Sequence, residues 1–209
     1  MTIEATETLP ATPPARPLIH PAWVRLTHWI NAVAIVVMIL SGWQIYNASP
    51  LFPFRFPNGI TIGVWLAGAL LWHFAAMWLL VINGIVYVAL GFASGRFKRK
   101  LWPIRPSEVI DDIRAALSGR LAHEDLSVYN AVQKLLYAGV LIAGLIIVLS
   151  GLAIWKPVQL QELTALFGGY DAARYVHFLA MAAIGGFILV HVAMALLVPK
   201  SLRAMITGR

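Results

Sequence analysis

Apolar residues gather in four long stretches of the chain, and the prolines and most of the charged residues lie outside them. Each stretch exceeds the roughly 20 residues that an α-helix needs to cross the hydrocarbon core of a bilayer. The sequence therefore predicts an all-α protein, a transmembrane four-helix bundle. The predicted spans are residues 23–46, 62–92, 128–155 and 172–198.

Composition favours the same assignment. Of the 209 residues, 60% are hydrophobic and 12% are charged, and the mean hydropathy is +0.77. A soluble domain of this size would have too few polar residues to cover its surface. We expect one membrane domain at 23–198, a flexible cytoplasmic tail at 1–22, and a cytoplasmic C-terminal tail at 199–209. The first tail has acids and prolines but no apolar core, which argues against a cleavable signal peptide.

Positive charge is distributed unevenly over the connecting segments. A basic run at residues 95–100 lies between the second and third spans, whereas the other two connections carry only Arg55 and Lys156. Because cytoplasmic loops hold the excess of Lys and Arg, both termini are predicted to be cytoplasmic. The net charge is +7, but the cations form no continuous stripe, so no nucleic-acid partner is expected.

Four of the six histidines lie inside predicted spans: His28, His73, His177 and His191. An ionisable side chain is costly in hydrocarbon, so such a residue usually has a partner and a function. The chain has no cysteine, which excludes thiolate-held iron–sulfur clusters and the covalent attachment of c-type haem. A cofactor must therefore be held by other groups, of which these histidines are the best candidates.

The histidine spacing predicts two ligand pairs. His177 and His191 are 14 positions apart on one span, which places them about 21 Å apart and about 40° apart around the helix axis. Topology and depth pair His191 with His28 near the cytoplasmic surface, and His177 with His73 towards the periplasmic side. Two facing imidazoles suit axial ligation of haem iron, and a six-coordinate iron favours electron transfer. We therefore expect two b-type haems packed between the helices.

Cations near these histidines are candidates for binding haem propionates. Arg25 precedes His28 by three residues, and Arg174 precedes His177 by the same interval. Lys156 closes the third span. Membrane anchoring explains Arg25 equally well, whereas Arg174 and Lys156 run against the charge bias on the periplasmic side.

The remaining polar residues have ordinary explanations. His20 and His123 are interpreted as solvated surface residues, and Asn31, Asn83 and Gln133 as interhelical hydrogen-bonding groups that could also border a quinone pocket. The apolar period of residues 106–120 predicts a short helix on the cytoplasmic surface, most simply a connector.

The sequence contains a short internal repeat, here called the echo. Residues 39–42 (Ile-Leu-Ser-Gly) resemble 148–151 (Val-Leu-Ser-Gly), and 73–77 (His-Phe-Ala-Ala-Met) resemble 177–181 (His-Phe-Leu-Ala-Met). The echo suggests two related helix pairs.

These motifs resemble a known family. The run Arg25-Leu26-Thr27-His28-Trp29, followed later by Ser41-Gly42, is similar to the first helix of bacterial cytochrome b561-type proteins. The pattern Arg174-x-x-His177 and then His191, with Phe187 between them, is similar to their last haem-bearing helix. The similarity covers all four spans and implies two b haems on the four histidines, quinone as the membrane redox partner, and a bacterial inner-membrane location.

Two branches of this family are relevant. The cytochrome b subunits of nickel–iron hydrogenases favour Thr at the place of Ser41 and a basic residue at the place of Phe178. Segments 83–87, 129–133 and 155–159 look more like the subunits that accompany periplasmic molybdopterin oxidoreductases. The resemblance therefore implies electron relay between quinone and a periplasmic redox enzyme, with quinone redox as the only chemistry of the chain itself.

Three alternatives stay open. A stand-alone superoxide:quinone oxidoreductase would use the same fold and ligands, with basic periplasmic residues steering the superoxide anion. A metal-ion transporter would use the intramembrane histidines as transient ligands. A haem-free scaffold subunit would leave four buried histidines unexplained. The sequence also leaves open a homo-oligomer and the direction of electron flow.

Overall fold

The computed structural model describes residues 18–118 and 129–208. Residues 1–17 of the predicted N-terminal tail and His123 lie outside the described residues. In the described ranges the chain folds into helices and loops, and the predicted all-α four-helix bundle is confirmed. The four helices long and apolar enough to cross a membrane are α1 (Ala22–Ala48), α2 (Leu66–Ala93), α5 (Ala131–Trp155) and α7 (Tyr170–Leu197).

The start of the second span differs from the prediction. α2 begins at Leu66 rather than at residue 62, because Gly63 and Val64 have positive φ angles of 107° and 60°. The amide of Trp65 donates to the carbonyl of Gly63 at 2.6 Å, which closes a tight turn immediately before the helix. Left-handed backbone cannot continue into an α-helix, so the apolar stretch is divided between loop and helix.

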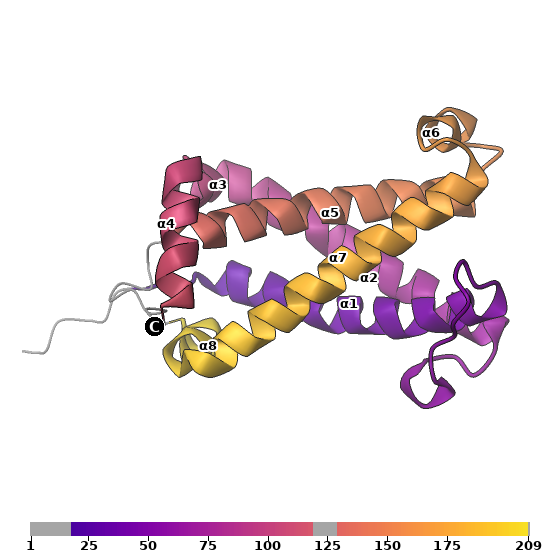
Figure 1. Ribbon diagram of the computed structural model, residues 1–209, viewed down its shortest axis with the longest axis horizontal. Helices are drawn as coiled ribbons and strands as arrows, with labels where there is room; N and C mark the ends of the chain where they lie inside the picture. Colours follow the sequence, from indigo (N-terminus) through magenta and orange to yellow (C-terminus); the bar gives the residue numbers. More distant parts are fainter. Residues whose placement is uncertain (1–17, 119–128, 209) are drawn as a thin grey trace, which may run out of the picture.

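The bundle consists of two antiparallel hairpins. α1 packs along α2, and α5 packs along α7, while the two hairpins approach each other closely at far fewer places (Figure 1). Small side chains line the contacts inside each hairpin, where Ala34, Ala69, Ala153 and Ala173 are at most 1% exposed. Small residues allow membrane helices to pack closely, which is the main source of helix association in lipid.

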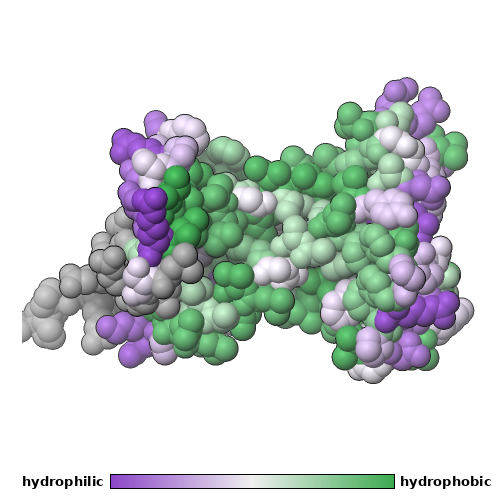
Figure 2. Space-filling view, in the orientation of Figure 1, coloured by the Kyte–Doolittle hydropathy of each residue, from purple (hydrophilic) through white to green (hydrophobic). Residues whose placement is uncertain are grey.

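Large apolar side chains point outward along the bundle. Leu71, Leu145 and Leu189 are all more than half exposed, and Figure 2 shows apolar surface across the middle of the molecule with polar residues gathered at both ends. A bilayer, whose core is about 30 Å thick, covers such a band.

Short helices lie at both ends of the bundle. At one end, here called the terminal end, are both termini of the described chain, α3 (Arg96–Leu101), α4 (Pro106–Leu117) and α8 (Pro199–Thr207) (Figure 1). The opposite end, the loop end, holds residues 49–65 with the 3-10 helix η1 (Asn58–Ile60), and α6 (Gln161–Leu166). The helix predicted within 106–120 is confirmed as α4, whereas α3, α6 and α8 were not predicted.

The two chain ends are joined at the terminal end. The backbone amides of Ile19 and His20 donate to the carbonyl of Gly208 at 2.9 and 3.4 Å, and Arg96 lies 3.2 Å from His20 Nδ1. His20 is only 8% exposed, so its interpretation as a solvated residue is wrong. Burial, together with the nearby charge of Arg96, lowers the pKa of His20 from 6.5 to about 4.

Two of the polar groups assigned to interhelical bonding have that role, and the third does not. Asn83 Nδ2 donates to Asn31 Oδ1 at 2.7 Å and to the carbonyl of Thr27 at 2.8 Å, which links α2 to α1. Gln133 instead forms a capping box with Asn130 at the start of α5, so its interhelical assignment is wrong.

Candidate functional site

The four intramembrane histidines form two pairs across the gap between the hairpins. The ring centroids of His28 on α1 and His191 on α7 are 5.9 Å apart, with 63° between the ring planes. Those of His73 on α2 and His177 on α7 are 6.4 Å apart, with 62° between the planes. Each pair thus takes one imidazole from each hairpin, and α7 contributes to both.

Hydrogen bonds orient the pair nearer the loop end. His177 Nδ1 lies 3.0 Å from the carbonyl oxygen of Ile147 and 3.2 Å from Ser150 Oγ. A carbonyl can only accept, so Nδ1 carries the hydrogen and Nε2 has a free lone pair. His73 Nδ1 lies 3.0 Å from Ser41 Oγ. The Ser41 hydroxyl already donates to the carbonyl of Val37 at 2.6 Å, so Nδ1 of His73 is the donor to Ser41.

Glycines bring the supporting helices close to these two rings. A Cβ atom added to Gly151 would lie 3.1 Å from His177 Cε1, and one added to Gly42 would lie 3.4 Å from His73 Cε1. Both glycines follow a completely buried serine, Ser150 and Ser41 respectively. The echo in the sequence therefore corresponds to two equivalent cradles, one in each hairpin, that each hold one histidine.

The pair nearer the terminal end is held differently. His191 stacks on Phe187, with centroids 5.6 Å apart and 12° between the planes, and His28 meets the ring of Trp29 edge-on at 5.3 Å. Across residues 18–118 and 129–208, no hydrogen bond joins the imidazole of His28 or of His191 to another group. Packing alone orients these two rings.

The spacing within each pair fits one metal between two imidazoles. A bond from imidazole nitrogen to a metal is about 2 Å, and the nitrogen lies about 1 Å from the ring centre, so two rings on one metal have centroids about 6 Å apart. Both observed spacings agree with this value. The described residues contain no group of three or more His, Cys, Asp or Glu that could hold a metal ion, so the donors occur as isolated pairs. Paired imidazoles with no third ligand suit haem, whose macrocycle supplies the other four donors.

Unpaired buried donors occur near both pairs. Arg25 Nε and Trp43 Nε1 are buried and have no acceptor within the described part of the chain. Arg25 lies one helical turn before His28, and Trp43 follows Gly42, the glycine against the ring of His73. Buried donors without acceptors are rare, and a carboxylate of a bound cofactor would satisfy them.

The structure separates the three cations proposed for propionates. Arg25 donates from Nη1 to the carbonyl of Ile206 at 2.6 Å, which connects α1 to α8. Arg174 donates from Nη2 to the carbonyl of Ser49, the C-terminal cap of α1, at 2.5 Å. Lys156 is exposed and lies over the ring of Trp155 at 4.9 Å. Among the described residues, no hydrogen bond, ion pair or ring contact joins Lys156 to a histidine pair.

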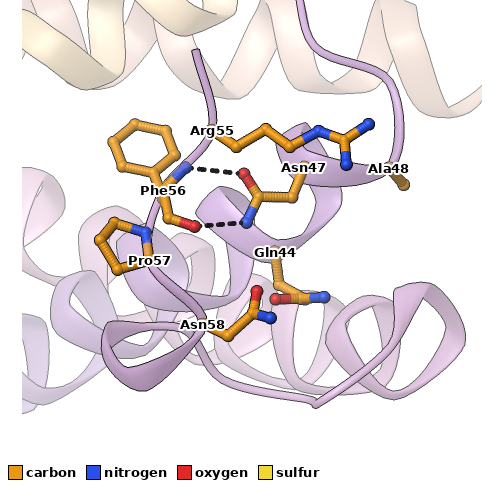
Figure 3. A pocket seen from close by; sticks show the side chains of 7 residues that line it. All are labelled: Gln44, Asn47, Ala48, Arg55, Phe56, Pro57 and Asn58. Atoms are coloured by element: carbon orange, nitrogen blue, oxygen red, sulfur yellow. Dashed lines mark hydrogen bonds between the residues drawn. The ribbon is translucent and has the colours of Figure 1, made fainter.

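A separate pocket lies at the loop end. It has a volume of about 430 Å³ and is lined by Gln44, Asn47, Ala48 and residues 55–58 (Figure 3). The amide of Asn47 bonds both the backbone N–H and the carbonyl of Phe56, at 2.9 and 2.8 Å. The lining contains no histidine, so this pocket is distinct from the imidazole pairs.

Sequence reasoning identified the histidines but missed the groups that orient two of them. Ser41 and Ser150 appeared in the echo, and Ser41 also in the family resemblance, but neither was assigned a partner. Their pairing with His73 and His177 depends on the packing of α1 on α2 and of α5 on α7. The available signal was a repeated pattern: in each hairpin, Ser-Gly on the first helix is followed by His-Phe on the second.

Comparison with known proteins gives two findings. The family described as prokaryotic cytochrome b561 matches residues 19–208. The putative protein-methionine-sulfoxide reductase subunit YedZ1 of Azospira oryzae is 52% identical over 190 residues, which cover 91% of this chain and 96% of that protein.

Proposed function

This chain belongs to the prokaryotic cytochrome b561 family, and we propose that it is a di-haem subunit that relays electrons between quinone and a periplasmic redox enzyme. Family membership makes it a membrane cytochrome of electron transport with b-type haem. The number of haems, their ligands, the quinone and the partner belong to the proposal. The proposal rests on two imidazole pairs at different depths of the bundle. In each pair the ring centroids are separated by about the distance expected for two imidazoles bound to one metal.

We assign one haem to each pair. His73 and His177 would bind iron through Nε2, because Nδ1 of each ring is engaged by its cradle. His28 and His191 form the second ligand set. When bound, haem supplies a one-electron couple that neither transfers atoms nor needs an open coordination position. Arg25 supplies a donor for propionates at the terminal end, and Arg174 with Lys156 supplies positive charge at the loop end.

The distribution of charge supports an orientation with the terminal end in the cytoplasm. α3 and its neighbours carry Arg96, Lys98, Arg99 and Lys100, whereas residues 49–65 and α6 together carry the single cation Arg55. The excess of positive charge belongs on the cytoplasmic side. His73 and His177 then lie nearer the periplasm, where a partner enzyme would exchange electrons.

The relative suggests which partner this is. The Azospira oryzae protein is named as a subunit of a putative protein-methionine-sulfoxide reductase, and the similarity extends over nearly the whole of both chains. We therefore propose that the present chain delivers electrons to an enzyme that reduces methionine sulfoxide in periplasmic proteins. The quinone pool of the membrane is the proposed electron source.

A reduced-minus-oxidised absorption spectrum of the detergent-purified protein tests the proposal, with haem and protein both quantified. We expect two low-spin b haems per chain, and we expect a short-chain quinol to reduce them. A preparation expressed with adequate haem supply that contained none would refute the assignment. Bound divalent metal in its place would favour transport, and superoxide oxidation by the isolated chain would favour the stand-alone enzyme.

A further inference from the structure

The two haem sites differ in how their histidines are supported. At the site nearer the loop end, each imidazole donates a hydrogen bond from Nδ1 to the neighbouring helix of its own hairpin. At the other site, no described residue accepts such a bond, and the rings of Phe187 and Trp29 contact the imidazoles instead. The two sites therefore differ in contacts made within the chain: hydrogen bonds at one and ring contacts at the other.

The serine oxygens are suited to accept and not to donate. The Ser41 hydroxyl donates to the carbonyl of Val37 at 2.6 Å, and the Ser150 hydroxyl donates to the carbonyl of Ile146 at 2.7 Å. Each hydroxyl hydrogen is thereby used within its own helix, so each oxygen presents lone pairs to the histidine. Both serines are completely buried, which shields their hydroxyl groups from solvent.

Accepting from Nδ1–H changes the electronic character of the ligand. The imidazole gains partial negative charge, becomes a stronger donor through Nε2, and stabilises ferric over ferrous iron. From these contacts we infer that Ser41 and Ser150 are positioning residues that fix the Nδ1–H tautomer of His73 and His177 and lower the reduction potential of that haem. The inference rests on the proposed function, since it requires haem on this pair.

With haem bound between His73 and His177, each cradle would act on it through a different histidine. Ser41 acts through His73 from the first hairpin, and Ser150 acts through His177 from the second. Their effects on the potential should therefore add at the loop-end site and be absent at the site of His28 and His191. A merely structural role would predict no such selectivity.

Redox titration of the purified full chain, followed by absorption and electron paramagnetic resonance, tests the inference. Loss of a group that hydrogen-bonds a metal-ligating histidine typically changes metal affinity or activity 10- to 100-fold. We expect an effect at the low end of this range, because Ile147 still accepts from His177 after the serine is lost. We therefore expect Ser150→Ala to raise the equilibrium constant for one-electron reduction of one haem about tenfold, or about 59 mV, and to leave the other unchanged. Ser41→Ala should shift the same haem, and the double variant should shift it further.

Thr27 provides a matched control. It is a buried hydroxyl residue next to His28, and its hydroxyl bonds the carbonyls of Trp23 and Val24 in its own helix. Within the described part of the chain, this hydroxyl forms no hydrogen bond with a histidine. Thr27→Val should leave both potentials at their wild-type values.

The outcomes separate this inference from the proposed function. Wild-type protein without two haems would refute the proposed function. Two haems with unchanged potentials in both alanine variants, or with equal shifts of both haems, would overturn the inference alone. If the alanine variants lose haem, Ser41→Cys and Ser150→Cys provide the second test, because sulfur is a weaker acceptor of similar size. Cysteine variants that keep both haems at wild-type potentials would also overturn it.

Discussion

Removing single histidines gives the sharpest test of the ligand assignment. We expect His177→Ala to lose the haem nearer the loop end and to keep the other, because His28 and His191 remain intact. His191→Ala should do the reverse. In either case the ratio of haem to protein should fall from two to one.

The geometry explains why these losses should be independent. His177 and His191 are 14 residues apart on the continuous helix α7, a separation of about 21 Å. Substitutions more than about 10 Å apart that share no partner usually act additively. Each alanine removes one ligand from its own pair, where the opposing rings are 6.4 or 5.9 Å away, and leaves the distant pair unchanged.

Double variants test the pairing itself. His73→Ala with His177→Ala removes two ligands of one proposed site, so one haem should remain. His73→Ala with His191→Ala removes one ligand from each site, so no six-coordinate haem should remain. The assay is quantitative haem extraction combined with the low-spin absorption spectrum of each variant in detergent.

The opposite pattern would refute the assignment. If the variant lacking His73 and His177 lost both haems, while the variant lacking His73 and His191 kept one, the pairs would be crossed. If any single alanine variant kept two six-coordinate haems, the replaced histidine would not be a ligand.

Two further outcomes are expected from groups away from the haem ligands. Asn83→Ala removes both hydrogen bonds to α1, those to Asn31 and to the Thr27 carbonyl. The free energy of unfolding in detergent should therefore fall by about 1–2 kcal/mol. An unchanged value would show that these bonds do not stabilise the bundle. His20 has a folded-state pKa of about 4, below its ordinary 6.5, so the unfolded state binds more protons between these values and stability falls as pH falls through this window. Protection of the α8 amides against hydrogen exchange should therefore decrease as the pH falls from 6.5 to 4. His20→Gln should remove that dependence.

Several features of the site could be predicted because they depend only on order and spacing. Four apolar runs of bilayer length imply an up-and-down bundle, and helix periodicity places His177 and His191 on one side of α7 whatever surrounds it. Antiparallel neighbours then bring the histidine of the first span to the depth of His191, and that of the second towards His177.

Other features depended on contacts between distant segments. His20 was interpreted as solvated because it lies in the predicted N-terminal tail. The return of α8 across the start of the chain instead buries it beside Arg96. Gln133 has a polar side chain of the kind that often bonds between membrane helices. Because it lies three residues after Asn130, it instead completes the capping box at the start of α5.

The sequence by itself determined the membrane class, the number of spans and the four histidines proposed as haem ligands, because hydropathy and helical spacing are properties of each segment alone. Only the tertiary structure decided which groups orient the imidazoles of His73 and His177. That depends on the rotation of α1 against α2 and of α5 against α7, which is set by close packing at glycine and alanine. Ser41 and Ser150 therefore acquire their partners through packing between helices, although both stood in the sequence as an unexplained repeat.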